Sequence, residues 1–379
     1  MKAPGRALLR LVVPLMLCTA ATTGVAGAQR DIPGIPAVPI EPITGIVEMF
    51  KTHSVVALSE GNHGNEQGHA FRLALIRDPQ FSAVVNDIVV EFGNAHYQAV
   101  IDRFIQGEPV AHEELRKVWQ DTTQRGPVWD RPIYEEFYRA VRDVNAALPV
   151  ERRLRVLLGD VPMDWYAPQP GSPPRTDDFP ASLIQREVMA KKRRALVVYG
   201  GMHLLRKSAP FLPPKDPALP PVVAMLTSQL QNGSIVAQLD RFGARVFVVA
   251  TSTDFDISTL QANVVAWPRP SLALIRGTPL GFASSLTYFP RSLPVIRGRG
   301  GIQETLQFDP AAVPPMQEVV DAILYLGPPS SMTHSRLSRE LCADAAYVVM
   351  RVERLSEFAS PGRDPSAAFK AECAAVLQR

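Results

Sequence analysis

Short apolar runs alternate with helical stretches along most of this chain, and this alternation limits the fold more than any other feature. The runs are rich in valine, leucine and isoleucine. Near-continuous apolar strands separated by helices are typical of a parallel sheet covered on both faces. We therefore predict an α/β fold with a mainly parallel sheet and helices on both sides. The predicted strands are residues 55–58, 88–90, 154–158, 195–198 and 246–250, with a last one within 321–327.

Helices are predicted between these strands and at the C-terminal end. They cover residues 67–76, 97–105, 134–147, 182–192, 335–358 and 365–377, and the last two form a helical hairpin. The predicted organisation is a signal peptide (1–28), an α/β domain (29–330) and a C-terminal helical extension packed on it (331–379).

Proline-rich segments interrupt the pattern at three places. Residues 31–44 are too punctuated by proline for regular structure and are expected to lie across the surface. Residues 167–180 and 207–221 are expected to be lids, substrate walls or disordered excursions, as long irregular segments in a compact domain usually are.

The N-terminal end predicts export. Lys2, Arg6 and Arg10 precede an apolar run and then small residues ending at Ala28, as in a cleaved signal peptide cut before Gln29. Without this segment 37 basic and 37 acidic residues remain. No later stretch approaches the ~18 apolar residues that span a bilayer. We expect a soluble periplasmic or secreted protein with no membrane span, and no positive field that would attract nucleic acid.

Two local features are given structural interpretations. The basic run 191–194 is interpreted as the cationic end of a helix, where it complements the helix dipole. Cys342 and Cys373 lie on the two consecutive C-terminal helices. In an oxidising compartment they are a plausible pair, although the helical spacing does not demand a disulfide.

Acidic and imidazole side chains follow four predicted strands. Glu60 and His63 follow the first, Glu91 closes the second, Asp160 closes the third and His203 follows the fourth. In an open parallel sheet, ligands bind outside the carboxyl ends of the strands. The sequence therefore predicts a polar crevice at this edge.

Two kinds of chemistry suit these residues. In the first, His63 is a general base whose pKa is set by Glu60 and Glu91, and it activates water against an ester, lactone or amide carbonyl. His203 and Arg72 then steady the developing negative charge. In the second, four side chains hold a divalent metal such as Zn, Mn or Fe, because mixed carboxylate and imidazole sets suit these ions. These ligands would be Glu60, His63, Glu91 and His203.

Substrate contacts are predicted for Arg72, Asp160 and Glu66. Structural explanations also exist: Glu60 or Glu91 could cap a helix or pair with a buried arginine such as Arg72. Glu66 is followed three residues later by His69 on one helical face, which an exposed salt-bridged stripe explains. The chain lacks the sequence motifs of nucleotide-binding loops, of the α/β-hydrolase nucleophile elbow and of HExxH zinc proteases.

Several segments, taken in order, resemble a known superfamily. They are VVALSEGNHG, DIVVEFGNAHYQAVIDRFIQG, WDRPIYEEF, LRVLLGDVP and RALVVYGGMHLLR, which together cover roughly residues 54–250, and DAILYLGP near 321–328. They resemble the superfamily that joins the erythromycin esterases, the ChaN-like haem-uptake proteins and the Tiki proteases.

The esterase branch of this superfamily implies roles for four residues. It makes His63 the water-activating base, with Glu60 and Glu91 orienting it, and lets Arg72 bind substrate or a carboxylate. Two departures are Ser59 and Gly200, which stand where that branch has a glycine and a histidine.

The ChaN-like branch resembles this chain in EFGNAHYQAVIDRFIQG and GGMHLL, and it implies a bacterial envelope protein that binds haem.

Taken together, the residues at the strand ends and the esterase resemblance lead us to predict an exported hydrolase without a cofactor. The alternative is a non-enzymatic binder of haem or a divalent metal, and a third possibility is a scaffold whose site has lost its activity. The substrate and the oligomeric state are not predicted.

Overall fold

The structure is a computed structural model that describes residues 34–167, 177–215, 233–253, 255–289, 292–296, 302–356 and 364–379. The predicted signal peptide lies outside these residues, as do parts of the two proline-rich segments 167–180 and 207–221. The described residues form an eight-stranded sheet in the order β1-β7-β10-β6-β2-β5-β3-β4.

Six neighbouring strands of this sheet run parallel, and all six predicted strands are confirmed. Each apolar run forms a strand whose apolar side chains are buried on both faces of the sheet. The strands are β2 (Val55–Ser59), β3 (Asp87–Asn94), β4 (Arg155–Asp160), β5 (Ala195–Tyr199), β6 (Val246–Thr251) and β10 (Ala322–Tyr325).

The two strands that lie beyond β10 at the side of the sheet were not predicted. Strand β7 (Ser271–Leu274) pairs antiparallel with β10, and β1 (Pro39–Ile40) pairs antiparallel with β7. The expectation that residues 31–44 lack regular structure is therefore wrong, since α1 (Pro42–Met49) also begins there. Pro42 occupies the first turn, where its missing N–H removes no helical bond, and the Glu41 carboxylate caps the backbone of Ile43 and Thr44.

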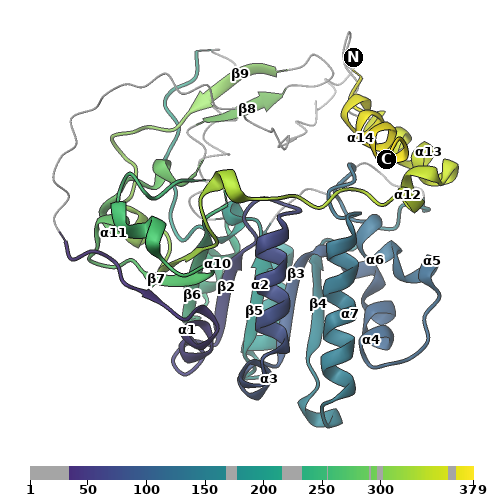
Figure 1. The fold of residues 1–379 in the computed structure, drawn as a ribbon, viewed down its shortest axis with the longest axis horizontal. Coiled ribbons are helices and arrows are strands. Elements are labelled where there is room, and N and C mark those ends of the chain that lie inside the picture. Colours follow the sequence, from purple (N-terminus) through teal and green to yellow (C-terminus); the bar gives the residue numbers. More distant parts are fainter. Residues whose placement is uncertain are drawn as a thin grey trace, which may run out of the picture.

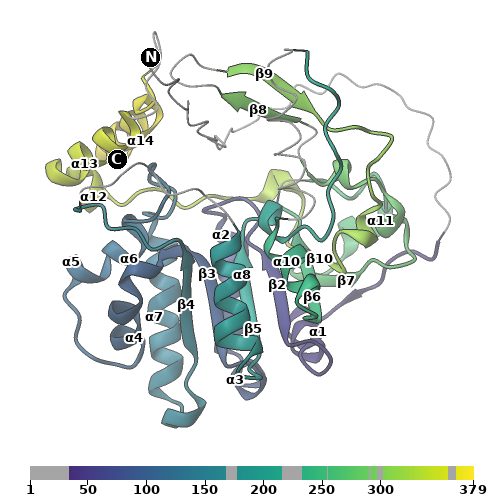
Figure 2. The ribbon, with the colours of Figure 1, turned by 180° about the vertical axis from the view of Figure 1, so that it is seen from behind.

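Helices cover both faces of the sheet, as the α/β prediction required (Figures 1 and 2). Strand residues alternate between the two layers: Val56 and Leu58 pack under one, Val55 and Ala57 under the other. The first layer contains α1, α2 (Glu66–Arg77), α3 (Pro79–Val84), α4 (Gln98–Ile105), α6 (Lys117–Gln120) and α7 (Pro132–Ala146), with α5 (His112–Leu115) beside α4. The second contains α8 (Asp178–Ile184), α10 (Ile235–Arg241) and α11 (Pro279–Phe282).

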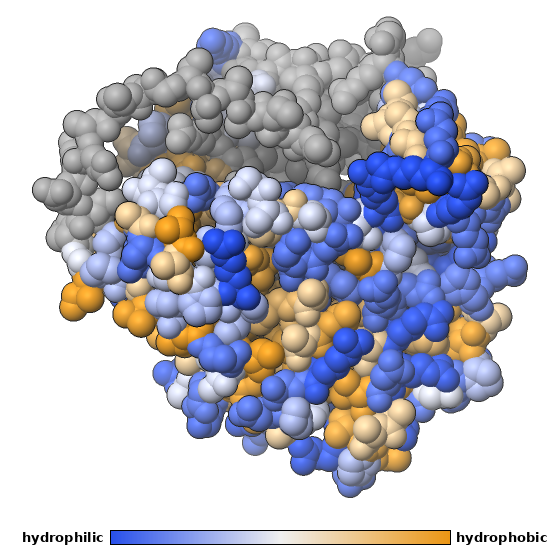
Figure 3. Space-filling view, in the orientation of Figure 1, coloured by the Kyte–Doolittle hydropathy of each residue, from blue (hydrophilic) through white to orange (hydrophobic). Residues whose placement is uncertain are grey.

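The helices of the first layer leave polar and apolar residues intermixed on their outer surface (Figure 3). This mixture is expected where each helix buries only one side. The helix predicted at 182–192 begins earlier, and it continues after α8 as a π-helical turn, η3 (Gln185–Met189).

The C-terminal helices lie beyond the carboxyl ends of the strands (Figure 1). They are α12 (Arg339–Ala343), α13 (Ala345–Ser356) and α14 (Ala367–Leu377). The helix predicted at 335–358 is divided because Asp344 ends α12 and its carboxylate accepts the N–H groups of Ala346 and Tyr347. A disulfide joins Cys342 to Cys373, with the Cα atoms 5.1 Å apart. A two-stranded hairpin, β8 (Ser292–Ile296) and β9 (Ile302–Gln307), also lies beyond these strand ends.

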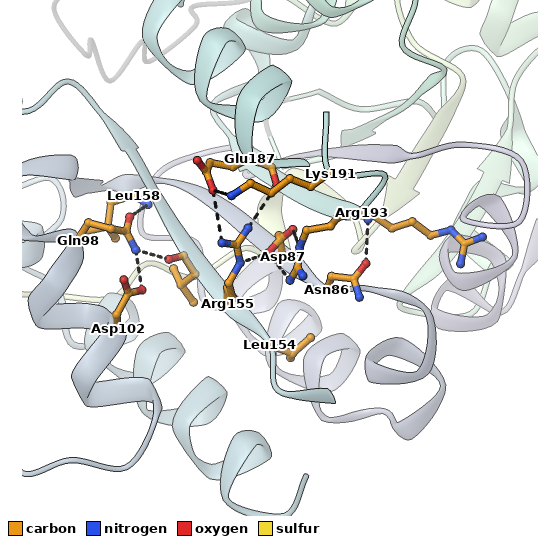
Figure 4. A network of polar contacts seen from close by, with 12 residues as sticks. Asn86, Asp87, Gln98, Asp102, Leu154, Arg155, Leu158, Glu187, Lys191 and Arg193 are labelled. Atoms are coloured by element: carbon orange, nitrogen blue, oxygen red, sulfur yellow. Dashed lines mark hydrogen bonds and ion pairs between the residues drawn. The ribbon is translucent and has the colours of Figure 1, made fainter. Parts of the chain in front are cut away.

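A polar network lies at the amino ends of the parallel strands, where β3, β4 and β5 begin (Figure 4). The fully buried Asp87 carboxylate accepts hydrogen bonds from Arg155 at 2.7 Å and from Arg193 at 2.7 and 2.9 Å. Lys191 pairs with Glu187 at 2.6 Å. Two members of the basic run 191–194 are thus engaged in ion pairs, which the sequence analysis did not predict.

Among the described residues, none of the helices combines the length and apolar character that crossing a bilayer requires.

Candidate functional site

The carboxyl ends of β2, β5 and β3 are adjacent in the sheet, and they bring four of the predicted side chains together. Glu60 and His63 follow β2, Glu91 lies in β3, and His203 lies in the 3-10 turn η4 (Gly201–Leu204) after β5. One ligand atom each of Glu60, His63 and Glu91 lies within 4.8 Å of the other two. The Nε2 atom of His203 is 3.4 Å from Glu91 Oε1. These four residues define the candidate site.

The Glu60 carboxylate is fully buried, and it accepts hydrogen bonds from other side chains of the protein. Its Oε2 accepts a hydrogen bond from His63 Nδ1 at 2.9 Å, and its Oε1 accepts one from the Tyr134 hydroxyl at 2.8 Å. Arg72 Nη2 lies 3.5 Å from Oε1. Burial alone would raise the pKa of Glu60, but the hydrogen bond and charge of His63, the charge of Arg72 and the Tyr134 bond together lower it.

The surroundings of His63 favour the protonated form of its ring. Burial would lower its pKa, but the bond and charge of Glu60 and the charge of Glu91 outweigh this effect and raise it. Because Nδ1 faces Glu60, Nε2 is the nitrogen that can act on a substrate. The edge of the Trp129 ring packs against the imidazole, with ring centroids 4.5 Å apart.

The loop that carries His63 turns through two glycines with positive φ, Gly61 at 72° and Gly64 at 82°. A β-carbon at Gly61 would lie 2.2 Å from Thr253 Oγ1, so only glycine fits there. The Tyr134 hydroxyl accepts the N–H of Gly64 at 2.9 Å while it donates to Glu60. Helix α7 thereby fixes both ends of the Glu60–His63 pair.

Glu91 is turned toward the site by an irregularity of its strand. The pairing of β3 with β4 shifts register between Val90 and Asn94, and such irregularities re-aim side chains. Glu91 Oε2 accepts the N–H of Gly200 at 2.7 Å. A β-carbon at Gly200 would stand 3.4 Å from Glu91 Oε2, 3.4 Å from His63 Cε1 and 3.5 Å from His203 Cδ2. Gly200 therefore lies between these three side chains, within van der Waals distance of each for any added β-carbon.

Sequence reasoning missed Asp177, whose Oδ1 lies 2.6 Å from His203 Nδ1. Asp177 precedes the first turn of α8, within the segment that was predicted only as a lid, a wall or a disordered excursion. It also missed Tyr134 and Trp129, although both belong to the quoted segment WDRPIYEEF. No local pattern marks these residues, because their contacts with the site cross between elements.

The predicted substrate-binding residues lie in different places. Arg72 is buried behind Glu60. Asp160 lies at the end of β4, and its two oxygens accept the N–H and the hydroxyl of Thr123, each at 2.6 Å. Glu66 is exposed at the start of α2 and accepts the Thr333 hydroxyl at 2.5 Å. Asp160 and Glu66 are thus engaged with loops around the site.

His69 does not form an exposed stripe with Glu66. It is 5% exposed, and its Nε2 lies 3.1 Å from a Glu136 carboxylate oxygen. The sequence interpretation was wrong because α2 packs against α7, which turns this face inward. Burial and the charge of Arg72 lower the pKa of His69 to about 4, so its ring is neutral at pH 7.

Comparison with known proteins finds no family model and no curated protein that matches this chain. Solved structures with a similar arrangement include both branches named from the sequence. A mutant erythromycin esterase in its open conformation is 11% identical, with a TM-score of 0.45 over 78% of this chain and 94% of that one. ChaN of Campylobacter jejuni, described with cofacial haem, is 13% identical, with a TM-score of 0.31 over 56% of this chain and 86% of that one.

A succinoglycan biosynthesis protein is 11% identical, with a TM-score of 0.47 over 80% of this chain and 96% of that one. At these identities and TM-scores the neighbours do not decide an activity. The α/β assignment comes from the sheet of this chain itself.

Proposed function

We propose that this protein hydrolyses an ester, lactone or amide bond, with His63 as the general base. The observation that carries the proposal is the bond between His63 Nδ1 and the fully buried Glu60. A carboxylate at Nδ1 fixes the tautomer and the orientation of an imidazole, which leaves Nε2 to take a proton from water.

The surrounding groups have supporting roles in this proposal. Glu91, held by the N–H of Gly200, lies close enough to His63 to orient the attacking water. His203 faces the same space and is 39% exposed at its side chain, so it can meet the reacting carbonyl. Arg72 is 3% exposed at its side chain, and we assign it to holding the charge of Glu60 rather than to contact with substrate.

The alternative function is non-enzymatic binding of a divalent metal or haem, and one observation favours the metal. Glu60, His63 and Glu91 place oxygen and nitrogen donors within 4.8 Å of one another, a set that suits Zn, Mn or Fe. Both Glu60 oxygens are already hydrogen-bonded. A metal bound by these three residues would therefore replace one hydrogen bond of Glu60, with His203 as the fourth ligand predicted from the sequence.

Export to the periplasm or the medium is part of the proposal. It is supported by the sequence of residues 1–28 and by the Cys342–Cys373 disulfide, because disulfides persist in oxidising compartments.

The test is hydrolysis of aryl esters and lactones by the purified protein and by His63→Ala. Loss of a general base should lower kcat/KM by roughly 10²- to 10⁴-fold. The matched control is His112→Ala, which removes an imidazole that lies on the outside of α5 and pairs with Glu135. Unchanged turnover in His63→Ala, with folding intact by circular dichroism, would exclude the mechanism.

Elemental analysis and a haem titration of the same sample test the alternative. Stoichiometric metal or a Soret band, without hydrolysis, would favour the binding protein.

A further inference from the structure

We propose that Asp177 orients His203 so that His203 acts as the general acid that protonates the leaving group. This inference rests on the proposed hydrolase function and assigns the second proton transfer of that reaction.

The two ring nitrogens of His203 both face carboxylates. Nδ1 lies 2.6 Å from Asp177 Oδ1, and Nε2 lies 3.4 Å from Glu91 Oε1. Only the contact with Asp177 is a hydrogen bond, whereas the separation from Glu91 is the distance of an ion pair between that carboxylate and a protonated ring. The arrangement thus suits an imidazole that holds a proton on Nε2 and can release it.

The site then contains two carboxylate–imidazole pairs, each joined through Nδ1 of the ring. In the Glu60–His63 pair the side chains are 0% and 12% exposed, whereas in the Asp177–His203 pair they are 17% and 39% exposed. Both rings approach the position that a β-carbon would occupy at Gly200, one through Cε1 and the other through Cδ2. The inner pair is placed to activate water, and the outer pair is placed where an alcohol can depart to solvent.

Proton transfer balances over one turnover. His63 Nε2 takes a proton from water as the water oxygen bonds to the carbonyl carbon. The bond between this carbon and the leaving oxygen then breaks, and the leaving oxygen takes the proton from His203 Nε2. A proton passes from His63 to solvent and one from solvent to His203, so that both residues return to their starting states.

Asp177 belongs to a different element from His203, which makes it a positioning residue. It stands before α8, and His203 lies in η4 after β5. Their bond crosses between these elements, so the ring direction of His203 depends on how the start of α8 is placed.

The test compares Asp177→Asn with the parent protein on esters of one acid that differ in the leaving group. Nitrophenolate leaves without a proton, so hydrolysis of the p-nitrophenyl ester should fall by less than about 3-fold. An alkoxide needs the proton, so hydrolysis of the alkyl ester should fall by roughly 10²-fold or more. His203→Ala should show the same selective loss, and the double variant should be no worse than the worse single variant.

The matched control is Asp178→Asn, which changes the neighbouring exposed carboxylate and should leave both rates unchanged. An equal loss on all esters in Asp177→Asn would overturn the inference and leave Asp177 a structural residue. A parent protein that hydrolyses none of the esters would instead refute the proposed function, so the two failures are distinguishable.

Discussion

At the scale of single residues, the site is organised by where each proton is held. Glu60 is charged despite complete burial, because His63, Arg72 and Tyr134 all favour its carboxylate form. The same charge raises the pKa of His63. A base of this kind binds its proton more strongly than an isolated imidazole, and it is available only above its raised pKa.

This coupling predicts the pH dependence of activity. Because neutral His63 is the active form, kcat/KM should rise with pH through a pKa above the ordinary histidine value. Glu60→Gln removes the charge that raises this pKa, so the rising limb should move to lower pH. The plateau should also fall by roughly 10-fold or more, because the ring loses its charged partner.

The measurement is kcat/KM between about pH 5 and 9 on one activated ester, with thermal unfolding at each pH to confirm that the variant is folded. A limb that stays in place, or moves to higher pH, would contradict the role assigned to Glu60.

At the scale of elements, the carboxyl and amino ends of the parallel strands have different roles. The carboxyl ends carry Glu60, His63 and Glu91, whereas the amino ends are fastened by Asp87 with Arg155 and Arg193 (Figure 4). Asp87 is fully buried, and each arginine side chain is about one-third exposed, at 32% and 30%. The network therefore ties the starts of β3, β4 and β5 together at a distance from the chemistry.

Removing this anchor should affect stability rather than chemistry. Asp87→Ala should lower the free energy of unfolding by about 2–4 kcal/mol, below the full cost of breaking a buried pair because the arginines can reach water. Urea unfolding measures this change. The rate of hydrolysis per folded molecule should stay at the parent level.

The control is Asp102→Ala, which removes an exposed carboxylate that accepts a hydrogen bond from Gln98 (Figure 4). It should change the free energy of unfolding by less than about 0.5 kcal/mol. A similar loss in both variants would show that Asp87 is not a special anchor.

At the scale of the whole molecule, the C-terminal helices hold the segment that borders His63. Arg351 on α13 is 1% exposed and donates to both oxygens of Asp130, at 2.7 and 2.6 Å. Asp130 follows Trp129, whose ring contacts His63. On the other side of Asp130, Arg131 pairs with Glu372 of α14 at 2.7 Å. The C-terminal unit is thus joined to the wall of the candidate site by buried and half-buried ion pairs.

Arg351→Met tests this connection. It leaves the buried Asp130 carboxylate without its cation, and should lower the free energy of unfolding by roughly 3–5 kcal/mol. Adding Asp130→Asn removes the uncompensated charge and should recover a large part of that loss. Urea unfolding of both variants measures the difference. A single variant that costs under about 1 kcal/mol, or a double variant that is worse than the single one, would show that the pair does not fasten the C-terminal helices.

The sequence alone determined the parallel sheet and the residues that leave its carboxyl edge. Apolar runs and helical periods are local properties, so the six strands could be placed before any contact was known. The strand-end rule then selected Glu60, His63, Glu91, Asp160 and His203, of which Asp160 bonds to Thr123 instead of joining the other four. Edge elements such as β1 and β7 escaped notice, since they are only two and four residues long and show no extended apolar run.

Only the tertiary structure decided which groups those side chains would meet. The strand order β2-β5-β3 brings Glu91 and His203 to His63, and it follows from packing rather than from any local pattern. Tyr134 and Asp177 reach Glu60 and His203 from other elements, 74 and 26 residues away along the chain. The burial of His69 against α7 had the same origin. Contacts of this kind depend on the arrangement of whole helices and strands, because a side chain's partner across a layer is set by the packing of both elements.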